Sequence, residues 1–83
     1  MTNKQRIEIG SFIREARYCD YSEIKVGMLS YVNPNLHLVN IVYTSKSSEG
    51  KRLYRLVGEY SRLSSATKLM KEIQEVLSEA GLN

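Results

Sequence analysis

The feature that most restricts the fold of this chain is an apolar stripe near its C-terminus. Over residues 64–80, apolar side chains recur at spacings of three and four, which places them on one face of an α-helix. They are Ala66, Leu69, Met70, Ile73, Val76, Leu77 and Ala80. We expect Ser64 or Ser65 to cap the start of this helix and Gly81 to end it with a positive φ. A helix with one apolar stripe needs an apolar surface to pack against, which the rest of the chain must supply.

The middle of the chain has the composition of β-strands. Residues 36–44, LHLVNIVYT, are apolar at both odd and even positions, as is typical of a central strand. Residues 52–60, RLYRLVGEY, predict a second strand, and the polar loop between the two contains Gly50. Pro34 marks a turn before the first of them, because proline cannot donate to a strand ladder.

Two segments nearer the N-terminus complete the expected order of elements. Residues 21–32 alternate in polarity and contain a glycine, which favours a strand, although Asp20 and Glu23 have the spacing of a capping box, which favours a helix. We predict the strand. Thr2 and Gln5 also have capping-box spacing, and an apolar stripe follows them, so we expect an N-terminal helix. The stripe consists of Ile9, Phe12, Ile13 and Ala16.

These elements predict a small α+β protein with a single domain over residues 1–83. The expected order is helix–strand–strand–strand–helix, with a three-stranded antiparallel meander and both helices packed on one face, because that arrangement buries both stripes at once. The alternative order, α-α-β-β-α, follows if residues 21–32 are helical. Chains of this length hold one hydrophobic core.

Composition argues against several classes of function. One histidine, one cysteine and scattered carboxylates predict no metal site, and the absence of a Gly-rich phosphate loop predicts no nucleotide cofactor. The first residues lack the apolar run of a signal peptide, and no stretch is apolar enough to cross a membrane. The lone Cys19 fits a reducing, cytoplasmic setting. His37 is the only candidate for acid–base chemistry at neutral pH, so we expect a protein that is not an enzyme.

The positive charge is concentrated between the second predicted strand and the final helix. Residues 44–71 carry seven Lys and Arg against two Glu, whereas residues 72–83 carry three Glu and no cation. We take five of these cations as candidate binding residues for an anion or a partner. They are Arg52, Arg55, Arg62, Lys68 and Lys71. A cation in the first helical turn opposes the helix dipole. Either Lys–Glu pairs four residues apart offset that cost, or the cations form an anion site.

The predicted order resembles that of double-stranded-RNA-binding domains, which place lysines at the start of the second helix. Here the resemblance consists of the element order and Lys68, since "SSATK" stands where that family has a Lys-Lys-x-x-x-Lys run. HicA-type RNase toxins share the order and carry a catalytic histidine on a strand. His37 takes a similar position without their Gly-Ser-His context. These resemblances imply a nucleic-acid backbone binder as one alternative function, and an RNase that uses His37 as another.

The tyrosines point toward protein contact. The chain has six Tyr and no Trp, and Tyr is favoured at interfaces because it combines an apolar body with a polar end. We take Tyr31, Tyr54 and Tyr60 as candidate interface aromatics, since helices on one face of a sheet leave the other face uncovered. The leading hypothesis is a small regulatory protein without catalytic activity. It would act through its open sheet face, an edge strand or self-association.

Overall fold

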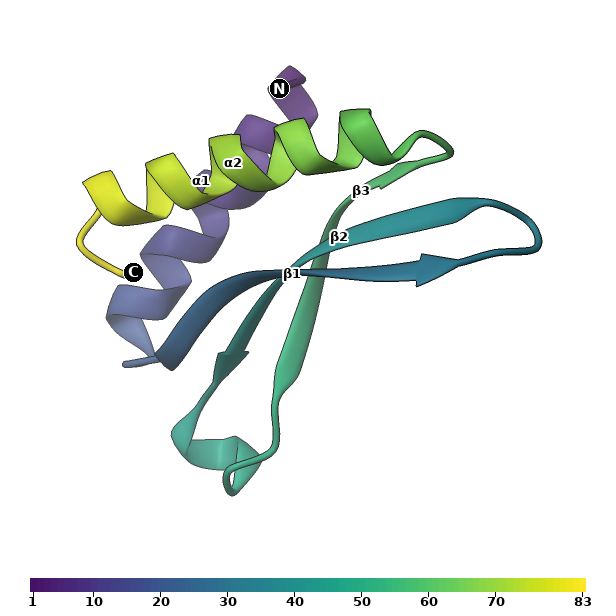
Figure 1. Cartoon of the computed structure of the whole chain (residues 1–83). Helices are drawn as coiled ribbons and strands as arrows, with labels where there is room; N and C mark the ends of the chain where they lie inside the picture. Colours follow the sequence, from purple (N-terminus) through teal and green to yellow (C-terminus); the bar gives the residue numbers. More distant parts are fainter.

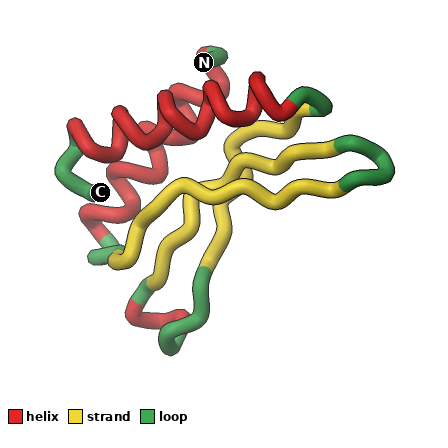
Figure 2. The backbone as a smooth tube through the Cα atoms, viewed as in Figure 1, coloured by secondary structure: helices red, strands yellow, loops and turns green.

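The computed structural model describes all residues from 1 to 83 and confirms the predicted order of elements. Figure 2 shows the helical segments in red, the strands in yellow and the loops that join them in green. The elements are α1 (Asn3–Tyr18), β1 (Ser22–Tyr31), β2 (Leu36–Thr44), the short 3-10 helix η1 (Lys46–Ser48), β3 (Leu53–Tyr60) and α2 (Leu63–Glu79). The segment that could have been helix or strand is therefore a strand, and the alternative order is wrong.

The three strands form one antiparallel sheet in the order β1-β2-β3, so β2 is central, as its two apolar faces predict. Both helices lie on the same side of this sheet, and its other side is uncovered (Figure 1). Contacts from α2 reach all three strands, whereas α1 lies mainly against β3.

The ends of the two helices follow the capping rules with one exception. Thr2 and Gln5 form the predicted capping box at the start of α1. At the end of α2, Gly81 has φ +74° and the amide of Leu82 donates to the carbonyl of Leu77 at 3.0 Å, which closes the helix as predicted. The predicted serine N-cap is wrong, because α2 begins at Leu63 and its N-cap, Arg62, makes no capping hydrogen bond through its side chain.

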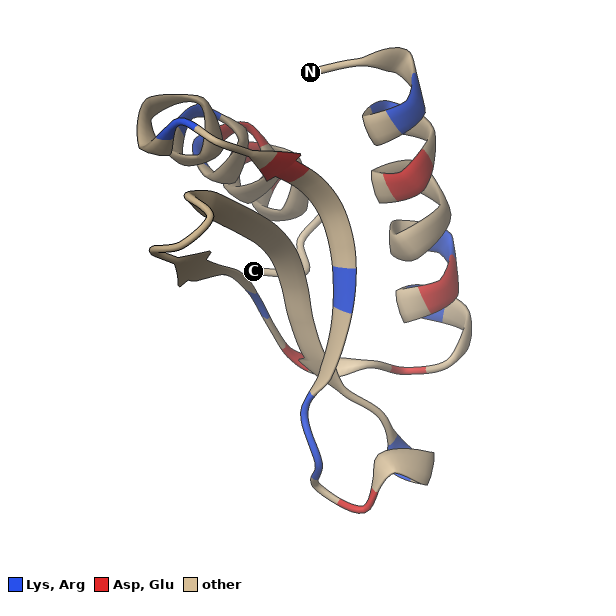
Figure 3. Ribbon diagram, turned by 90° about the vertical axis from the view of Figure 1, so that its right-hand side faces the viewer, with Lys and Arg blue, Asp and Glu red and all other residues tan.

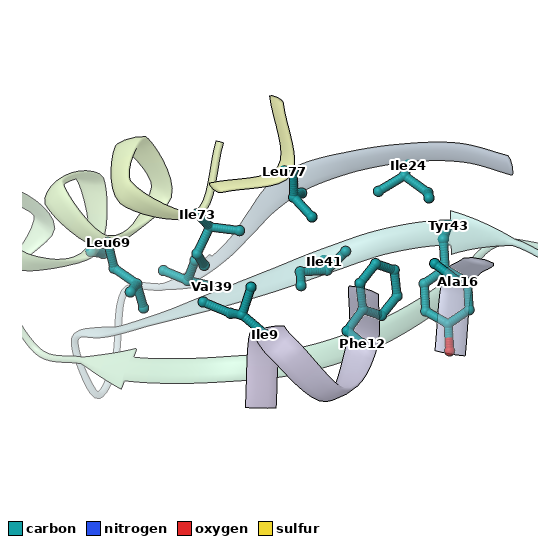
Figure 4. Close-up of a cluster of buried hydrophobic side chains, with 11 residues drawn as sticks. Ile9, Phe12, Ala16, Ile24, Val39, Ile41, Tyr43, Leu69, Ile73 and Leu77 are labelled. Atoms are coloured by element: carbon teal, nitrogen blue, oxygen red, sulfur yellow. The ribbon is translucent and has the colours of Figure 1, made fainter. Parts of the chain in front are cut away.

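The core lies between the helices and the covered face of the sheet. Figure 4 shows apolar side chains from α1, α2, β1 and β2 pointing toward one another. The largest fully buried side chains are Ile9, Phe12, Val39, Ile41, Leu69, Ile73 and Leu77. Both sequence stripes contribute to this group, which confirms that they are core.

A bulge in β3 decides which of its side chains face the helices. Val39 pairs with Gly58 and the next residue, Asn40, pairs with Leu56, so one extra residue lies in β3 between these pairs. Tyr54 therefore shares the uncovered side with Leu56, whereas Tyr60, beyond the bulge, faces the helices.

No helix of the structure is long and apolar enough to cross a membrane.

Candidate functional site

The uncovered side of the sheet, which we call the open face, carries four of the eight exposed large apolar residues of the molecule. The strand register arranges its side chains in three rows of three. The first row is Leu29, Leu38 and Glu59, the second is Gly27, Asn40 and Leu56, and the third is Lys25, Val42 and Tyr54. Tyr31 and its partner Leu36 extend the first column and the central column beyond the first row.

Four large apolar side chains on this face are about half exposed. Leu29 is 50% exposed, Tyr31 52%, Tyr54 59% and Leu56 45%. These are four of the eight large apolar residues that the molecule exposes, and the other four belong to the helices and to the turn after β1. Apolar side chains gathered on one face, rather than scattered singly, mark an interaction surface.

The centre of the open face is recessed and contains one polar group. Asn40 and Val42, which lie on the central strand, are each only 6% exposed. The side-chain amide of Asn40 donates to the carbonyl of Leu38 at 3.3 Å, and its side-chain oxygen accepts no hydrogen bond from the protein.

Charge on the open face is confined to two corners. Lys25 begins the third row on β1 and Glu59 ends the first row on β3, so they lie diagonally opposite each other. Both are exposed, and neither takes part in an ion pair within the chain. The face therefore has an apolar body, a polar centre and one free charge of each sign at its edge.

Two of the residues taken from the sequence as binding candidates lie on the covered side instead. The hydroxyl of Tyr60 accepts a hydrogen bond from the side-chain amide of Gln5 at 2.9 Å, which ties β3 to α1. Arg55 donates to Glu15 at 2.9 Å, and its other terminal nitrogen lies 3.7 Å from Glu8. These contacts commit both side chains to holding α1 on the sheet, whereas Tyr31 and Tyr54 remain on the open face.

Glu15 is the centre of a small polar network beneath α1. The hydroxyl of Tyr21 donates to one carboxylate oxygen at 2.8 Å, and Arg55 donates to the other. Both hydrogen bonds lower the pKa of Glu15 below its usual value, and the one from Tyr21 has the larger effect. The same hydrogen bond raises the pKa of Tyr21. Arg55 also lies 5.5 Å from the ring centroid of Phe12, so the network is part of the packing between α1 and the sheet.

The remaining cations do not gather on one surface. Arg52 precedes β3 and Arg62 follows it, so the eight residues of β3 separate them, a span of roughly 25 Å at about 3.3 Å per residue. Figure 3 shows Lys and Arg distributed over both helices, β3 and the loops, with acidic residues between them on α1. Only Arg62, Lys68 and Lys71 share one region, the N-terminal half of α2.

The two lysines of α2 are exposed and have no acidic partner. The expected pairs with Glu72 and Glu75 are not formed, and Glu72 instead accepts from the amino group of Met1 at 3.1 Å. Because α2 begins at Leu63, Lys68 lies in its second turn rather than its first. The dipole penalty expected from the sequence is therefore small, since that effect is confined to the first turn.

His37, the remote candidate for catalysis, lies at the edge of the covered face. It is 9% exposed, and its Nδ1 is 2.7 Å from the hydroxyl oxygen of Ser30 on the neighbouring strand. A serine beside an imidazole is the first half of a nucleophilic arrangement. Neither residue lines any of the cavities on the molecule, and no third group orients the ring. The pair joins β1 to β2.

The sequence predicts an open sheet face, but Tyr31 and Tyr54 are the only residues of this face among the predicted site residues. Lys25, Leu29 and Leu56 were missed because which face they take follows from the strand register, and Glu59 was missed because the bulge in β3 turns it to the open face. Alternation along residues 25–31 is the signal that could have found the β1 residues. In comparisons with known proteins, no family model, no curated protein and no solved structure matches this chain.

Proposed function

We propose that this chain is a small regulatory or adaptor protein that acts by protein–protein contact through the open face. The observation that carries the proposal is the concentration of half of the exposed large apolar residues on that face. Burying such side chains favours association by about 25 cal/mol per Å² of apolar area. Tyr31 and Tyr54 also suit an interface, because a tyrosine brings a rigid ring together with a hydroxyl group.

The edge of the sheet next to this face supports the same proposal. β1 is an edge strand, and its segment from Val26 to Tyr31 contains neither a charged residue nor a proline. Proteins usually protect exposed edges with such residues, as β3 does with Arg55 and Glu59. An unprotected edge beside an apolar face extends the surface that a partner can contact. The exposed, unpaired thiol of Cys19 fits a cytoplasmic location, which is part of the proposal.

A capture experiment with matched variants tests the proposal. The tagged chain is used to isolate proteins from the source cells, beside a Leu29→Ser/Leu56→Ser variant and an Ile7→Ser/Leu63→Ser control. All four residues are exposed, but only the first pair lies on the open face. We expect bound proteins to be lost with the first variant and retained with the control. Equal capture by both variants would show that the open face is not the binding surface.

Binding to a nucleic-acid backbone is the second candidate function. Its support is that Lys68 and Lys71 are exposed without acidic partners in the N-terminal half of α2, whose N-cap is a third cation, Arg62. It is the weaker candidate, because Arg55 is committed to internal ion pairs and Arg52 lies at the far end of β3. A salt titration of affinity for duplex RNA and DNA tests it. Backbone binding requires that log K fall with log salt, and that Lys68→Glu/Lys71→Glu lower the slope by about two.

A further inference from the structure

We propose that the occupant of the open face is a second copy of this chain, held in a symmetric dimer whose two sheets pack face to face with their strands nearly perpendicular. The inference rests on the proposed function, since it names the partner that the face takes. Its argument comes from the placement of charge, size and polarity across the three rows of the face.

The corner charges select one way of pairing two copies. A two-fold axis that lies between the sheets along the diagonal through Leu29, Asn40 and Tyr54 exchanges the other two corners. Lys25 of each copy then lies over Glu59 of the other, which forms two equivalent ion pairs from side chains that have no partner in the monomer. Axes parallel or perpendicular to the strands place each charge over an apolar residue instead. The diagonal axis corresponds to orthogonal sheet packing, a common arrangement of twisted sheets.

The dimensions of a sheet permit this pairing. Strands lie about 4.8 Å apart and alternate residues about 6.8 Å apart, so an axis at about 45° to the strands passes close to Leu29 and Tyr54 and brings each exchanged corner to within about 3 Å of its counterpart. The long, flexible side chain of Lys25 covers that difference.

Side-chain size is complementary under the same axis. Gly27, which has no side chain, comes to lie opposite Leu38 of the other copy. Leu56, which is 45% exposed, comes to lie opposite Val42, which is 6% exposed and recessed. Leu38 and Leu56 therefore each meet a low point of the other copy, which favours close packing there, whereas Leu29 lies at the axis and meets Leu29 of the other copy.

The polar residue at the centre of the face, Asn40, can pair with Asn40 of the other copy. Asn40 lies on the axis, so its side chain meets the same side chain of the other copy. A primary amide carries both a donor and an acceptor, and two of them can pair across a two-fold axis. The side-chain oxygen of Asn40, to which no protein group donates in the monomer, gains a protein donor in this way. A charged group in that place would repel its own copy.

The size of the face sets the strength of the expected dimer. Three strands over about eight residues cover roughly 14 by 26 Å, or about 400 Å² per copy in projection. The accessible area is larger because the side chains project, which places the interface near the lower end of specific complexes. We therefore expect a reversible dimer with a dissociation constant of micromolar order.

Charge exchange between two variants tests the geometry. Sedimentation equilibrium of the full chain is measured from about 1 μM to about 1 mM, a range that brackets the expected dissociation constant. The proteins are the wild type, Lys25→Glu, Glu59→Lys, the double exchange, and an equimolar mixture of the two single variants. Circular dichroism and melting curves check that each variant is folded, and Lys68→Glu serves as a charge-reversal control away from the face.

The proposal predicts that each single variant dimerises about tenfold more weakly than the wild type. The double exchange should recover the wild-type affinity. The mixture should recover it too, because the Lys25→Glu chain then presents two carboxylates at its corners to the two ammonium groups of the Glu59→Lys chain.

Two results would overturn the inference, and a third separates it from the proposed function. A wild type that stays monomeric over the whole concentration range overturns it. So does a dimer whose dissociation constant is unchanged by the charge exchanges, because such a dimer would pair through its β1 edges or its helices instead. A monomer whose captured protein is still lost with Leu29→Ser/Leu56→Ser overturns only the identity of the partner and leaves the proposed function standing.

Discussion

Replacing Gly58 by alanine should destabilise this protein, although the same change at most glycines without special backbone angles stabilises the fold. Gly58 does not have a positive φ, so alanine meets no conformational barrier there. What it meets is space that is already filled. A Cβ atom at Gly58 would lie 2.7 Å from Cδ2 of Leu69, 3.0 Å from Nε2 of Gln5 and 3.0 Å from Cε2 of Tyr60.

None of these three neighbours can move freely. Leu69 is 2% exposed and is packed into the core, and Gln5 is held by its hydrogen bond to Tyr60. Overpacking at such a site costs about 1–3 kcal/mol. For a domain of this size each kcal/mol changes the melting temperature by about 4–8 °C, so we expect Gly58→Ala to melt roughly 5–20 °C lower.

Gly10→Ala provides the matched control. Gly10 lies inside α1, and the nearest atom to an added Cβ is Nη1 of Arg14 at 3.8 Å, an ordinary contact. Alanine there should stabilise the protein by about 0.5–1 kcal/mol, the usual difference from glycine in a helix. Thermal unfolding of both variants beside the wild type gives the comparison. If Gly58→Ala is as stable as the wild type while Gly10→Ala behaves as expected, the reasoning from the close approach of β3 to both helices is refuted.

Three further predictions concern the core, the network and the surface. Ile73→Ala should cost about 2–5 kcal/mol in urea unfolding, since Ile73 is fully buried, and an unchanged midpoint would remove it from the core. Because the pKa of Glu15 is lowered in the folded state, its carboxylate stabilises the fold above its usual pKa of 4.5 and loses that contribution as the pH falls through the lowered value. Glu15→Gln should therefore be less stable than the wild type at about pH 7 and converge with it near pH 2, and a difference that is constant with pH would contradict the sign. Lys68→Glu should change the melting temperature little, because Lys68 lies in the second turn of α2 without an acidic partner, and a loss above about 1 kcal/mol would show that it holds the fold.

The fold was predictable because its signals are local and repeated. The stripe of α2, the capping box at Thr2 and the left-handed Gly81 each depend on residues within a few positions of one another. Strand 36–44 matches β2 in its bounds, since a continuous run of β-branched and apolar residues has no helical alternative.

The site was less predictable because it depends on pairing between distant segments. The bulge in β3 sends Tyr54 and Tyr60 to opposite faces, although simple alternation along 52–60 places them on one face. From the sequence alone Arg55 resembles an ordinary surface cation. In the structure α1 places Glu15 2.9 Å from it, a contact between residues 40 positions apart. The position of Lys68 in α2 was misjudged because the helix begins earlier than a serine cap would allow.

The central claim is that the open face is the surface through which this protein makes contact, and methyl NMR tests it most directly. The methyl resonances of Leu29, Leu38 and Leu56 are followed as the chain is concentrated from about 10 μM to about 1 mM, a range that brackets the dissociation constant expected above. Ile7 and Leu63, which are exposed on the helices, serve as internal references. We predict concentration-dependent shifts for the open-face methyls and none for the references. Shifts confined to Ile7 and Leu63, or open-face methyls that stay unchanged both on concentration and on addition of a captured protein, would contradict the account.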